Sequence, residues 1–123
     1  MADILIVDDS PTVLMSMEDL LRRFGHRAIR ANSAEEALSK VAGGLAPKLV
    51  ITDFHMPGKN GAELIAALRS KGSLRFTPML VLTTESQRER RNEAKAAGAT
   101  GWLVKPVDPK QLEAALAQLL PAA

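Results

Sequence analysis

Residues 49–61 read LVITDFHMPGKNG, a short apolar run that ends at an acid, Asp53, and continues into a turn rich in Pro and Gly. Residues 4–9 repeat this pattern, because ILIV runs directly into Asp8 and Asp9. An apolar run of this length, bounded by turn residues, is typical of a buried strand. The sequence therefore predicts two buried strands that each present a carboxylate at the carboxyl end.

Short apolar runs alternate with stretches of helical spacing along the whole chain. In those stretches apolar residues recur every three or four positions, as on a helix that buries one face. Strands that alternate with helices pair in parallel through right-handed crossovers, and the helices then cover both faces of one sheet. We therefore expect an α/β fold with a doubly wound parallel sheet, in which the Arg-flanked second strand lies at an edge. The expected strands are residues 4–7, 28–31, 49–51, 79–82 and 102–104.

Residue types at the expected helix ends agree with this order. A hydroxyl or carboxylate before a helix satisfies backbone amides that have no partner inside it, and proline is tolerated at the first helical position. Pairs that fit a helix start are Ser33 with Glu36, Ser86 with Glu89, and Asp108 with Pro109. Glycine commonly follows the last helical residue, and the candidates are Gly25, Gly72 and Gly98.

Composition narrows the class of protein. A chain of 123 residues with 46% hydrophobic and 24% charged residues suits one globular domain. A formal charge of +2 gives no electrostatic case for nucleic acid, and the lack of Cys excludes disulfides and thiolate chemistry. No apolar stretch is long enough for membrane insertion and no signal peptide is evident, so we expect a cytoplasmic protein.

Polar residues of the chain gather at the carboxyl ends of the expected strands, where a doubly wound sheet binds its ligands. Three carboxylates at one place repel one another, so we expect a hard divalent cation there. Mg²⁺ suits a set of carboxylate, water and phosphate oxygens. A phosphoryl group would meet metal, ammonium and hydroxyl at this edge. The residues expected to converge are Asp8, Asp9, Asp53, Thr83, Thr84 and Lys105.

Ordinary structural roles are the alternative for each of these residues. One acid of the pair Asp8 and Asp9 could cap a helix that begins near Pro11. Asp53 could be a turn acid, and Lys105 a solvated loop cation. Their shared position at one edge of the sheet favours a common site.

Four stretches, ILIVDDS, LVITDFHMPGKNG, TPMLVLTT and GATGWLVKP, resemble the receiver domain of two-component response regulators in order and spacing. The likeness covers essentially the whole chain. It implies a flavodoxin-like fold with strand order 2-1-3-4-5 and five helices on two faces. It also implies a single receiver domain over residues 1–123 with no output domain.

The resemblance implies that Asp53 becomes an aspartyl phosphate by transfer from a histidine kinase or a histidine phosphotransfer protein. Mg²⁺ would be held by Asp8, Asp9, Asp53 and the backbone carbonyl of His55. Such a protein is no enzyme in the ordinary sense, because it promotes only its own phosphorylation and dephosphorylation.

The resemblance also implies how phosphorylation would change the protein and where a target would bind. Lys105 would pair with phosphoryl oxygens, and Thr83 would donate its hydroxyl and move while the side chain at 102 changes rotamer. A downstream protein target would bind the fourth helix, fifth strand and fifth helix. Chemotaxis-like control is favoured over a phosphorelay by family frequency alone.

Three positions depart from the family pattern or vary within it. Trp102 stands where Tyr or Phe is usual, so either the switch is biased or this is an ordinary strand residue with one edge exposed. His55 and Glu85 border the phosphoryl site and are candidates for tuning hydrolysis. We expect residues 87–95 to be a solvated helix face, although its cations could meet an acidic partner: Arg88, Arg90, Arg91 and Lys95.

Two other functions remain open from the sequence. One is a Mg²⁺-dependent phosphohydrolase with Asp53 as nucleophile, in which His55 stands where such enzymes carry a second acid. The other is a scaffold of the same fold that binds partners without phosphorylation. A flavin or nucleotide binder fits less well, because two acids rather than a glycine-rich loop follow the first strand.

Overall fold

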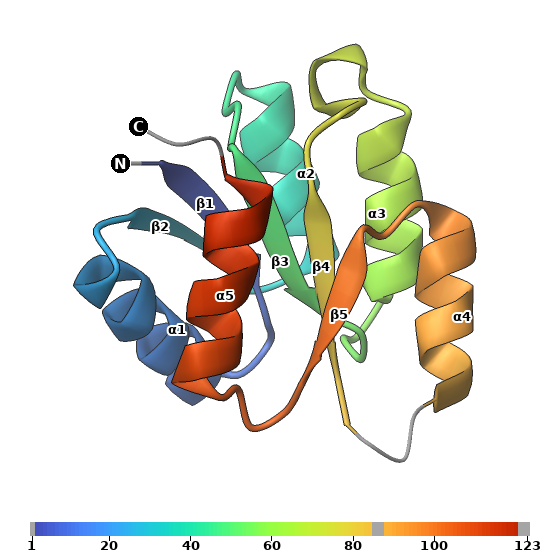
Figure 1. Ribbon diagram of the computed structural model, residues 1–123. Helices are drawn as coiled ribbons and strands as arrows, with labels where there is room; N and C mark the ends of the chain where they lie inside the picture. Colours follow the sequence, from blue (N-terminus) through green and yellow to red (C-terminus); the bar gives the residue numbers. More distant parts are fainter. Residues whose placement is uncertain (1, 85–87, 121–123) are drawn as a thin grey trace.

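The chain forms a three-layer α/β structure in a computed structural model that describes residues 2–84 and 88–120 (Figure 1). Strands and helices alternate along this part of the chain, as the sequence predicts. The elements are β1 (Asp3–Val7), α1 (Pro11–Arg23), β2 (Arg27–Ala31), α2 (Ala34–Ala42), β3 (Leu49–Asp53), α3 (Gly61–Arg69), the 3₁₀ helix η1 (Gly72–Leu74), β4 (Met79–Thr83), α4 (Arg88–Ala97), β5 (Gly101–Val104) and α5 (Pro109–Leu119).

The sheet is parallel throughout and has the order β2-β1-β3-β4-β5. This order and the edge position of β2 confirm the expectation from the sequence. Val7 at the end of β1 lies beside Thr52 of β3, and Thr83 at the end of β4 lies beside Val104 of β5. The carboxyl ends of these four strands therefore meet at one edge of the sheet.

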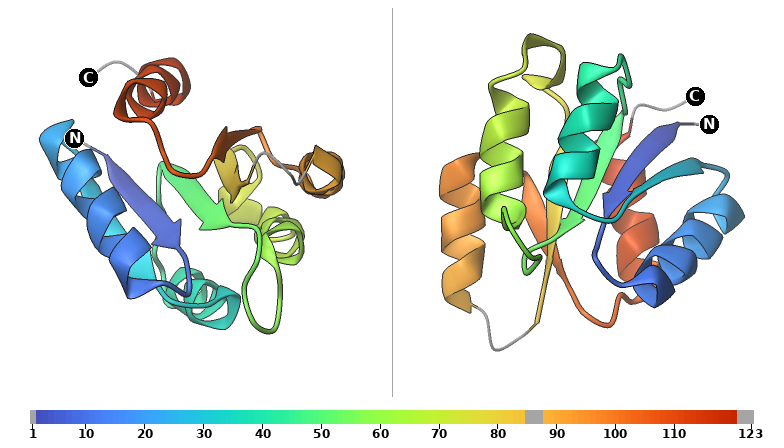
Figure 2. Two further views of the ribbon diagram at one scale, coloured as in Figure 1. Left: turned by 90° about the horizontal axis from the view of Figure 1, so that it is seen from below. Right: turned by 180° about the vertical axis from the view of Figure 1, so that it is seen from behind.

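Two apolar layers cover the sheet, and the alternation of side chains along each strand separates them. Ile4 and Ile6 of β1 pack on the layer of α1 and α5, whereas Leu5 and Val7 pack on the layer of α2, α3 and α4. Figure 2 shows this division from below, with α1 and α5 on one face of the sheet and the other helices opposite. Because β3 and β4 are buried over their whole length, they form the centre of the core.

Helix starts follow the predicted capping chemistry in part. The Ser33 hydroxyl accepts a hydrogen bond from the amide of Glu36 at 3.0 Å, but the Glu36 carboxylate returns to the amide of Asn32 and leaves the box incomplete. Asp108 caps α5 by accepting from the Lys110 amide. Ser86 lies outside the described residues. The complete capping box of the described chain, Asn60 with Glu63 before α3, went unpredicted.

Helix ends follow the predicted glycines at two of three positions. Gly25 and Gly98 come after α1 and α4 with φ of +85° and +112°, a conformation that favours glycine. Gly72 is different, because α3 ends earlier, at Arg69, and Gly72 begins η1. The Arg69 guanidinium donates to the carbonyls of Leu74 and Thr77, which folds this segment back against the end of α3.

None of the helices in the part of the chain that the structure describes is long and apolar enough to span a bilayer.

Candidate functional site

Three carboxylates from two adjacent strands form an acidic cluster at the carboxyl edge of the sheet. Asp8 and Asp9 follow β1, and Asp53 is the last residue of β3. One oxygen from each carboxylate lies within 4.8 Å of the others. Asp8 and Asp53 are buried, with 2% and 8% exposure, whereas Asp9 is exposed. The cluster is therefore open to solvent on the side of Asp9.

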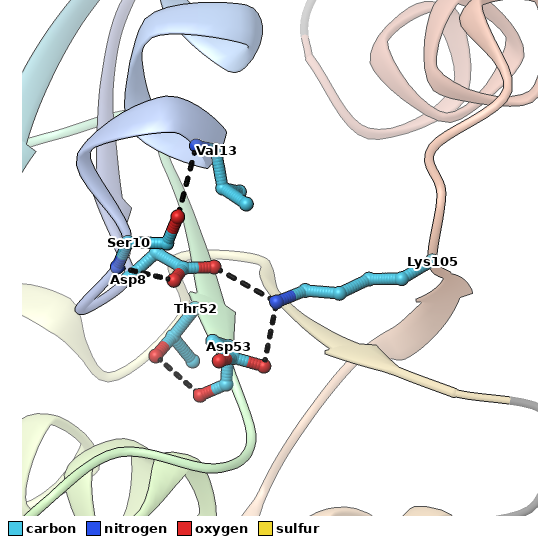
Figure 3. Close-up of polar contacts among 6 residues, drawn as sticks. All are labelled: Asp8, Ser10, Val13, Thr52, Asp53 and Lys105. Carbon is cyan, nitrogen blue, oxygen red and sulfur yellow. Dashed lines mark hydrogen bonds and ion pairs between the residues drawn. The ribbon is translucent and has the colours of Figure 1, made fainter.

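Lys105 brings a cation to this cluster from the end of β5. Its Nζ atom lies 3.0 Å from Asp8 Oδ2 and 3.2 Å from Asp53 Oδ1 (Figure 3). The Lys105 amide donates to the carbonyl of Thr83 at 2.7 Å, so the side chain starts from a fixed point beside β4. One ammonium thus bridges the two buried carboxylates.

The electrostatics of the cluster leave room for more positive charge. Burial raises the pKa of the Asp53 carboxyl, the charge of Asp8 raises it further, and Lys105 only partly opposes both. Burial by itself lowers the pKa of the Lys105 ammonium, but the hydrogen bond to Asp8 and the charge of Asp53 outweigh burial and raise it. Three carboxylates against one ammonium leave two negative charges uncompensated. The oxygen ligands and this deficit together fit a hard divalent cation.

Asp8 owes its position to the loop before α1. Its Oδ1 atom accepts a hydrogen bond from the Ser10 amide at 2.9 Å, and the Ser10 hydroxyl in turn caps α1 at the amide of Val13 (Figure 3). The alternative in which an acid of the pair caps this helix is therefore wrong, because Ser10 occupies that role. The carboxylate of Asp8 is left facing Lys105.

Thr83 contributes a buried hydroxyl at the end of β4. Its exposure is 1%, and its Oγ1 atom has no hydrogen-bond partner within the described residues. Leaving a buried hydroxyl without a partner costs about 1–3 kcal/mol. The Thr83 hydroxyl is therefore a buried donor without an acceptor among the described residues. Thr84, its neighbour, is exposed.

The loop behind Asp53 depends on a residue that sequence reasoning missed, Gly61. Its amide donates to the carbonyl of Phe54 at 2.7 Å. A Cβ atom at position 61 would lie 2.5 Å from the carbonyl oxygen of Asp53, so only glycine lets α3 begin this close to β3. The pair Asn-Gly at 60–61 was the available signal, and it was interpreted as part of a turn.

Comparison with known proteins decides which class this geometry belongs to. The family model described as the response regulator receiver domain matches residues 4–117. The chain belongs to this family. Such receivers are signalling domains rather than classical enzymes.

Relatives of similar length support the assignment. Protein PilH of Pseudomonas aeruginosa is 34% identical over 112 residues, which cover 91% of this chain and 92% of that protein. The chemotaxis protein CheY1 of Helicobacter pylori is 32% identical over 118 residues, 95% of each chain. The crystal structure of the chemotaxis response regulator CheY4 of Vibrio cholerae superposes with a TM-score of 0.89 at 40% identity, covering 98% of this chain and 99% of that one.

His55 and Trp102, two further predicted site residues of this receiver, contribute no side chain to the acidic cluster. The His55 side chain is exposed, and its ring meets the Phe54 ring edge-on at 5.2 Å between centroids. Trp102 on β5 is 44% exposed. Glu85 lies outside the described residues, so its predicted tuning role stays a prediction, as do the roles of His55.

The expected solvated helix face of residues 87–95 holds at Arg90, which is exposed and pairs with Glu93 at 3.3 Å, but not at the half-buried Arg91. The Arg90 guanidinium carbon lies 5.6 Å from the Phe54 ring centroid, and that of Arg91 lies 5.1 Å from the Trp102 ring centroid. Lys95 is exposed, as expected. Sequence periodicity cannot reveal such contacts, because each ring lies in a segment outside the helix.

A half-open apolar cleft of about 480 Å³ lies beside the cluster in this receiver, between α1 and the loop after β5. Lys105 forms part of its wall, so the cleft and the acidic cluster share one residue. The apolar part of its lining is Val13, Met17, Leu20, Pro106 and Val107. The sequence analysis did not anticipate it.

Proposed function

We propose that this receiver accepts a phosphoryl group on Asp53 from a histidine kinase or a histidine phosphotransfer protein, in a Mg²⁺-dependent reaction. It then signals by phosphorylation-dependent binding to a downstream protein. The observation that carries the proposal is the position of Lys105 Nζ, 3.0 Å from Asp8 and 3.2 Å from Asp53, at the edge of a cluster with excess negative charge.

The transfer is an in-line substitution at phosphorus. A carboxylate oxygen of Asp53 forms the new P–O bond while the P–N bond of the donor phosphohistidine breaks. The electron pair of that bond returns to the imidazole nitrogen, which takes a proton from water. Lys105 is within reach of the transferred group because it already contacts Asp53, and its ammonium offsets charge that develops on the phosphoryl oxygens.

Asp8, Asp9 and Asp53 are the side chains that would hold Mg²⁺, together with the backbone carbonyl of His55. One oxygen from each of the three carboxylates lies within 4.8 Å of the others, so small side-chain movements would bring all three onto one ion. When bound, the ion supplies charge neutralisation and orients the phosphoryl oxygens. Asp9 is the exposed member, so it leaves a path for hydrated ions to reach the buried pair.

Thr83 is the residue whose hydroxyl would respond to the phosphoryl group. Its buried hydroxyl has no partner among the described residues and gains one when a phosphoryl oxygen arrives. Charge-assisted hydrogen bonds from the hydroxyl and from Lys105 then favour one arrangement of the loop after β4. To reverse a population from 1:99 to 99:1 takes about 5.5 kcal/mol, which a few such bonds supply.

Two surfaces would serve the two partners. The phosphodonor must reach Asp53, and the apolar cleft between α1 and Lys105 offers it a contact surface beside that carboxylate. The downstream target would bind across α4, β5 and α5, where the exposed Trp102 lies. No contact with nucleic acid and no membrane insertion is part of the proposal.

The test is phosphorylation by a small donor, acetyl phosphate, with the mass of the intact protein as readout. We expect one added phosphoryl group in the native chain with Mg²⁺, stable in acid and labile in base. None is expected in Asp53→Asn or after chelation of the metal. Asp19→Asn, which removes an exposed acid of α1, is the matched control and behaves as native.

Modification of Asp53→Asn, or none in the native chain, would contradict the proposal. The alternatives give different signatures. A phosphohydrolase turns over small phosphate esters repeatedly and loses this activity in Asp53→Asn. A phosphorylation-independent scaffold binds its target equally well in both proteins.

A further inference from the structure

Helix α4 has few apolar anchors on the body of this receiver. Among its side chains that the structure describes, Ala94 alone is buried. By contrast, α1 buries Leu14, Met17 and Leu21. A helix without an apolar stripe needs other contacts to fix its position on the sheet.

Two neighbouring arginines supply such contacts in the first half of α4. Arg90 lies over Phe54, the residue that follows Asp53, and Arg91 lies over Trp102 on β5. Trp102 lies on β5 and Phe54 directly follows β3, and these two strands flank β4. Guanidinium groups within about 6 Å of an aromatic centroid are attracted by the negative face of the ring. Figure 1 shows α4 beside β5, with its first turn nearest the carboxyl edge of the sheet.

The contact of Arg91 with Trp102 leaves one hydrogen-bond donor of Arg91 unsatisfied in the part of the chain that the structure describes. The Nε atom of Arg91 is buried and has no hydrogen-bond partner within the described residues. Among the described residues, the ring of Trp102 is the partner that the structure shows for this guanidinium.

We propose that Arg91 is a positioning residue that holds the Trp102 ring in its exposed orientation, and that Arg90 fixes the same turn of α4 to Phe54. Arg91 thereby sets the resting position of Trp102. As far as the switch is concerned, this rests on the proposed function: a phosphoryl-driven inward movement of Trp102 must first break the contact with Arg91.

The contact itself can be tested without phosphorylation. Trp102 is the only Trp of the chain, so labelling with 5-fluorotryptophan gives one ¹⁹F resonance to follow. In metal-free, unphosphorylated protein we expect Arg91→Ala to move this resonance and to lower collisional quenching of the indole by acrylamide, because fewer rings stay in the exposed orientation. The ratio of exposed to inward-turned rings should fall roughly two- to fivefold, as expected for the loss of one cation–π contact. Arg91→Lys, which keeps the charge but not the planar group, should lie between Arg91→Ala and native.

Two matched controls separate stacking from loss of charge. Arg90→Ala removes the neighbouring cation, which contacts Phe54 and not Trp102, and Lys95→Ala removes an exposed cation of the same helix. Neither should move the resonance as Arg91→Ala does. If Arg91→Ala and Arg91→Lys both keep the native resonance and quenching, or if Lys95→Ala reproduces the effect, the proposal is overturned.

A second experiment joins the contact to the switch. With Mg²⁺ and beryllofluoride, a larger fraction of Trp102 rings should move in Arg91→Ala than in the native chain, as measured by the ¹⁹F resonance. Acetyl phosphate should still modify Asp53 to the native extent. A native response that is absent, or unchanged in Asp53→Asn, would refute the proposed function alone. The resting comparison of Arg91→Ala with native would still decide the role of Arg91.

Discussion

The ammonium of Lys105 lies 3.2 Å from the carboxylate of Asp53, so a residue that follows β5 contacts the last residue of β3 across the end of β4. Asp8 holds the same ammonium from the other side at 3.0 Å. Before any ion or phosphoryl group binds, Lys105 already occupies the position of a counterion.

Replacing Lys105 by methionine should therefore separate metal binding from phosphoryl transfer. Mg²⁺ should bind more tightly, because the competing cation is gone. Phosphorylation by acetyl phosphate should slow by roughly 10²–10³, the usual effect of losing one group that stabilises transition-state charge. Titration calorimetry and the rate of mass gain measure the two effects. Lys95→Met is the control, and equal changes in both variants would contradict this account.

Asp53→Asn should stabilise the metal-free protein near neutral pH. Burial, reinforced by Asp8, raises the folded-state pKa of Asp53 above its unfolded value. The folded state therefore binds more protons between these two values, and stability falls as pH rises through the folded-state pKa. The asparagine variant lacks this loss, so its advantage, roughly 0.5–3 kcal/mol, should vanish as pH falls toward 3.8, the unfolded reference. Urea unfolding at several pH values measures it, and a constant difference would refute the explanation.

Thr83→Val should make the resting protein more stable and insensitive to phosphorylation. The substitution keeps the shape of the side chain and removes a buried hydroxyl that has no partner in the described structure, a gain of about 1–3 kcal/mol. The beryllofluoride response of Trp102 fluorescence should be lost, and Thr83→Ser should retain it.

Thr100 offers a control of opposite sign. Its hydroxyl accepts a hydrogen bond from the Met79 amide at 2.9 Å, so Thr100→Val should destabilise the protein and leave the response intact. Similar stability changes at 83 and 100 would argue against an unsatisfied Thr83.

Gly61→Ala should damage both the fold and the acceptor loop. The added methyl would meet the Asp53 carbonyl oxygen at 2.5 Å and the Phe54 Cα atom at 2.9 Å, both backbone atoms. We expect a loss of about 1–3 kcal/mol, typical of overpacking, and slower phosphorylation. Gly72→Ala, where a Cβ meets nothing within 4 Å, is the control for thermal unfolding. Native stability in Gly61→Ala would contradict the close approach.

The strand order came from the resemblance to receiver domains, whereas patterns along the chain sufficed to predict a parallel sheet and the meeting of Asp8 with Asp53. That meeting follows from local periodicity and from one rule, that parallel strands present their carboxyl ends together. The same rule could not identify Ser10 as the cap of α1, because Asp8, Asp9 and Ser10 all carry an oxygen able to accept from a helix amide. The structure shows that Ser10 caps α1, while Asp8 accepts from the Ser10 amide and pairs with Lys105.

Other features arise only when distant segments meet. Three features join residues that are remote in sequence or face one another across a loop. They are the contact of Arg91 with Trp102, the cleft beside Lys105 and the space that Gly61 leaves for Asp53. Periodicity reports which face of an element is buried. It carries no information about the partner that covers it.

The sheet order separates the acidic cluster from the exposed ring of Trp102. The acidic cluster lies at the ends of β1 and β3, which have a strand on either side, whereas Trp102 lies on an outermost strand beside a helix with one buried side chain among those described. Under the proposed function, substitutions along β5 and α4 would therefore change partner binding without disturbing the acidic cluster. Related proteins could therefore differ in the partners that they bind while keeping the same acidic cluster.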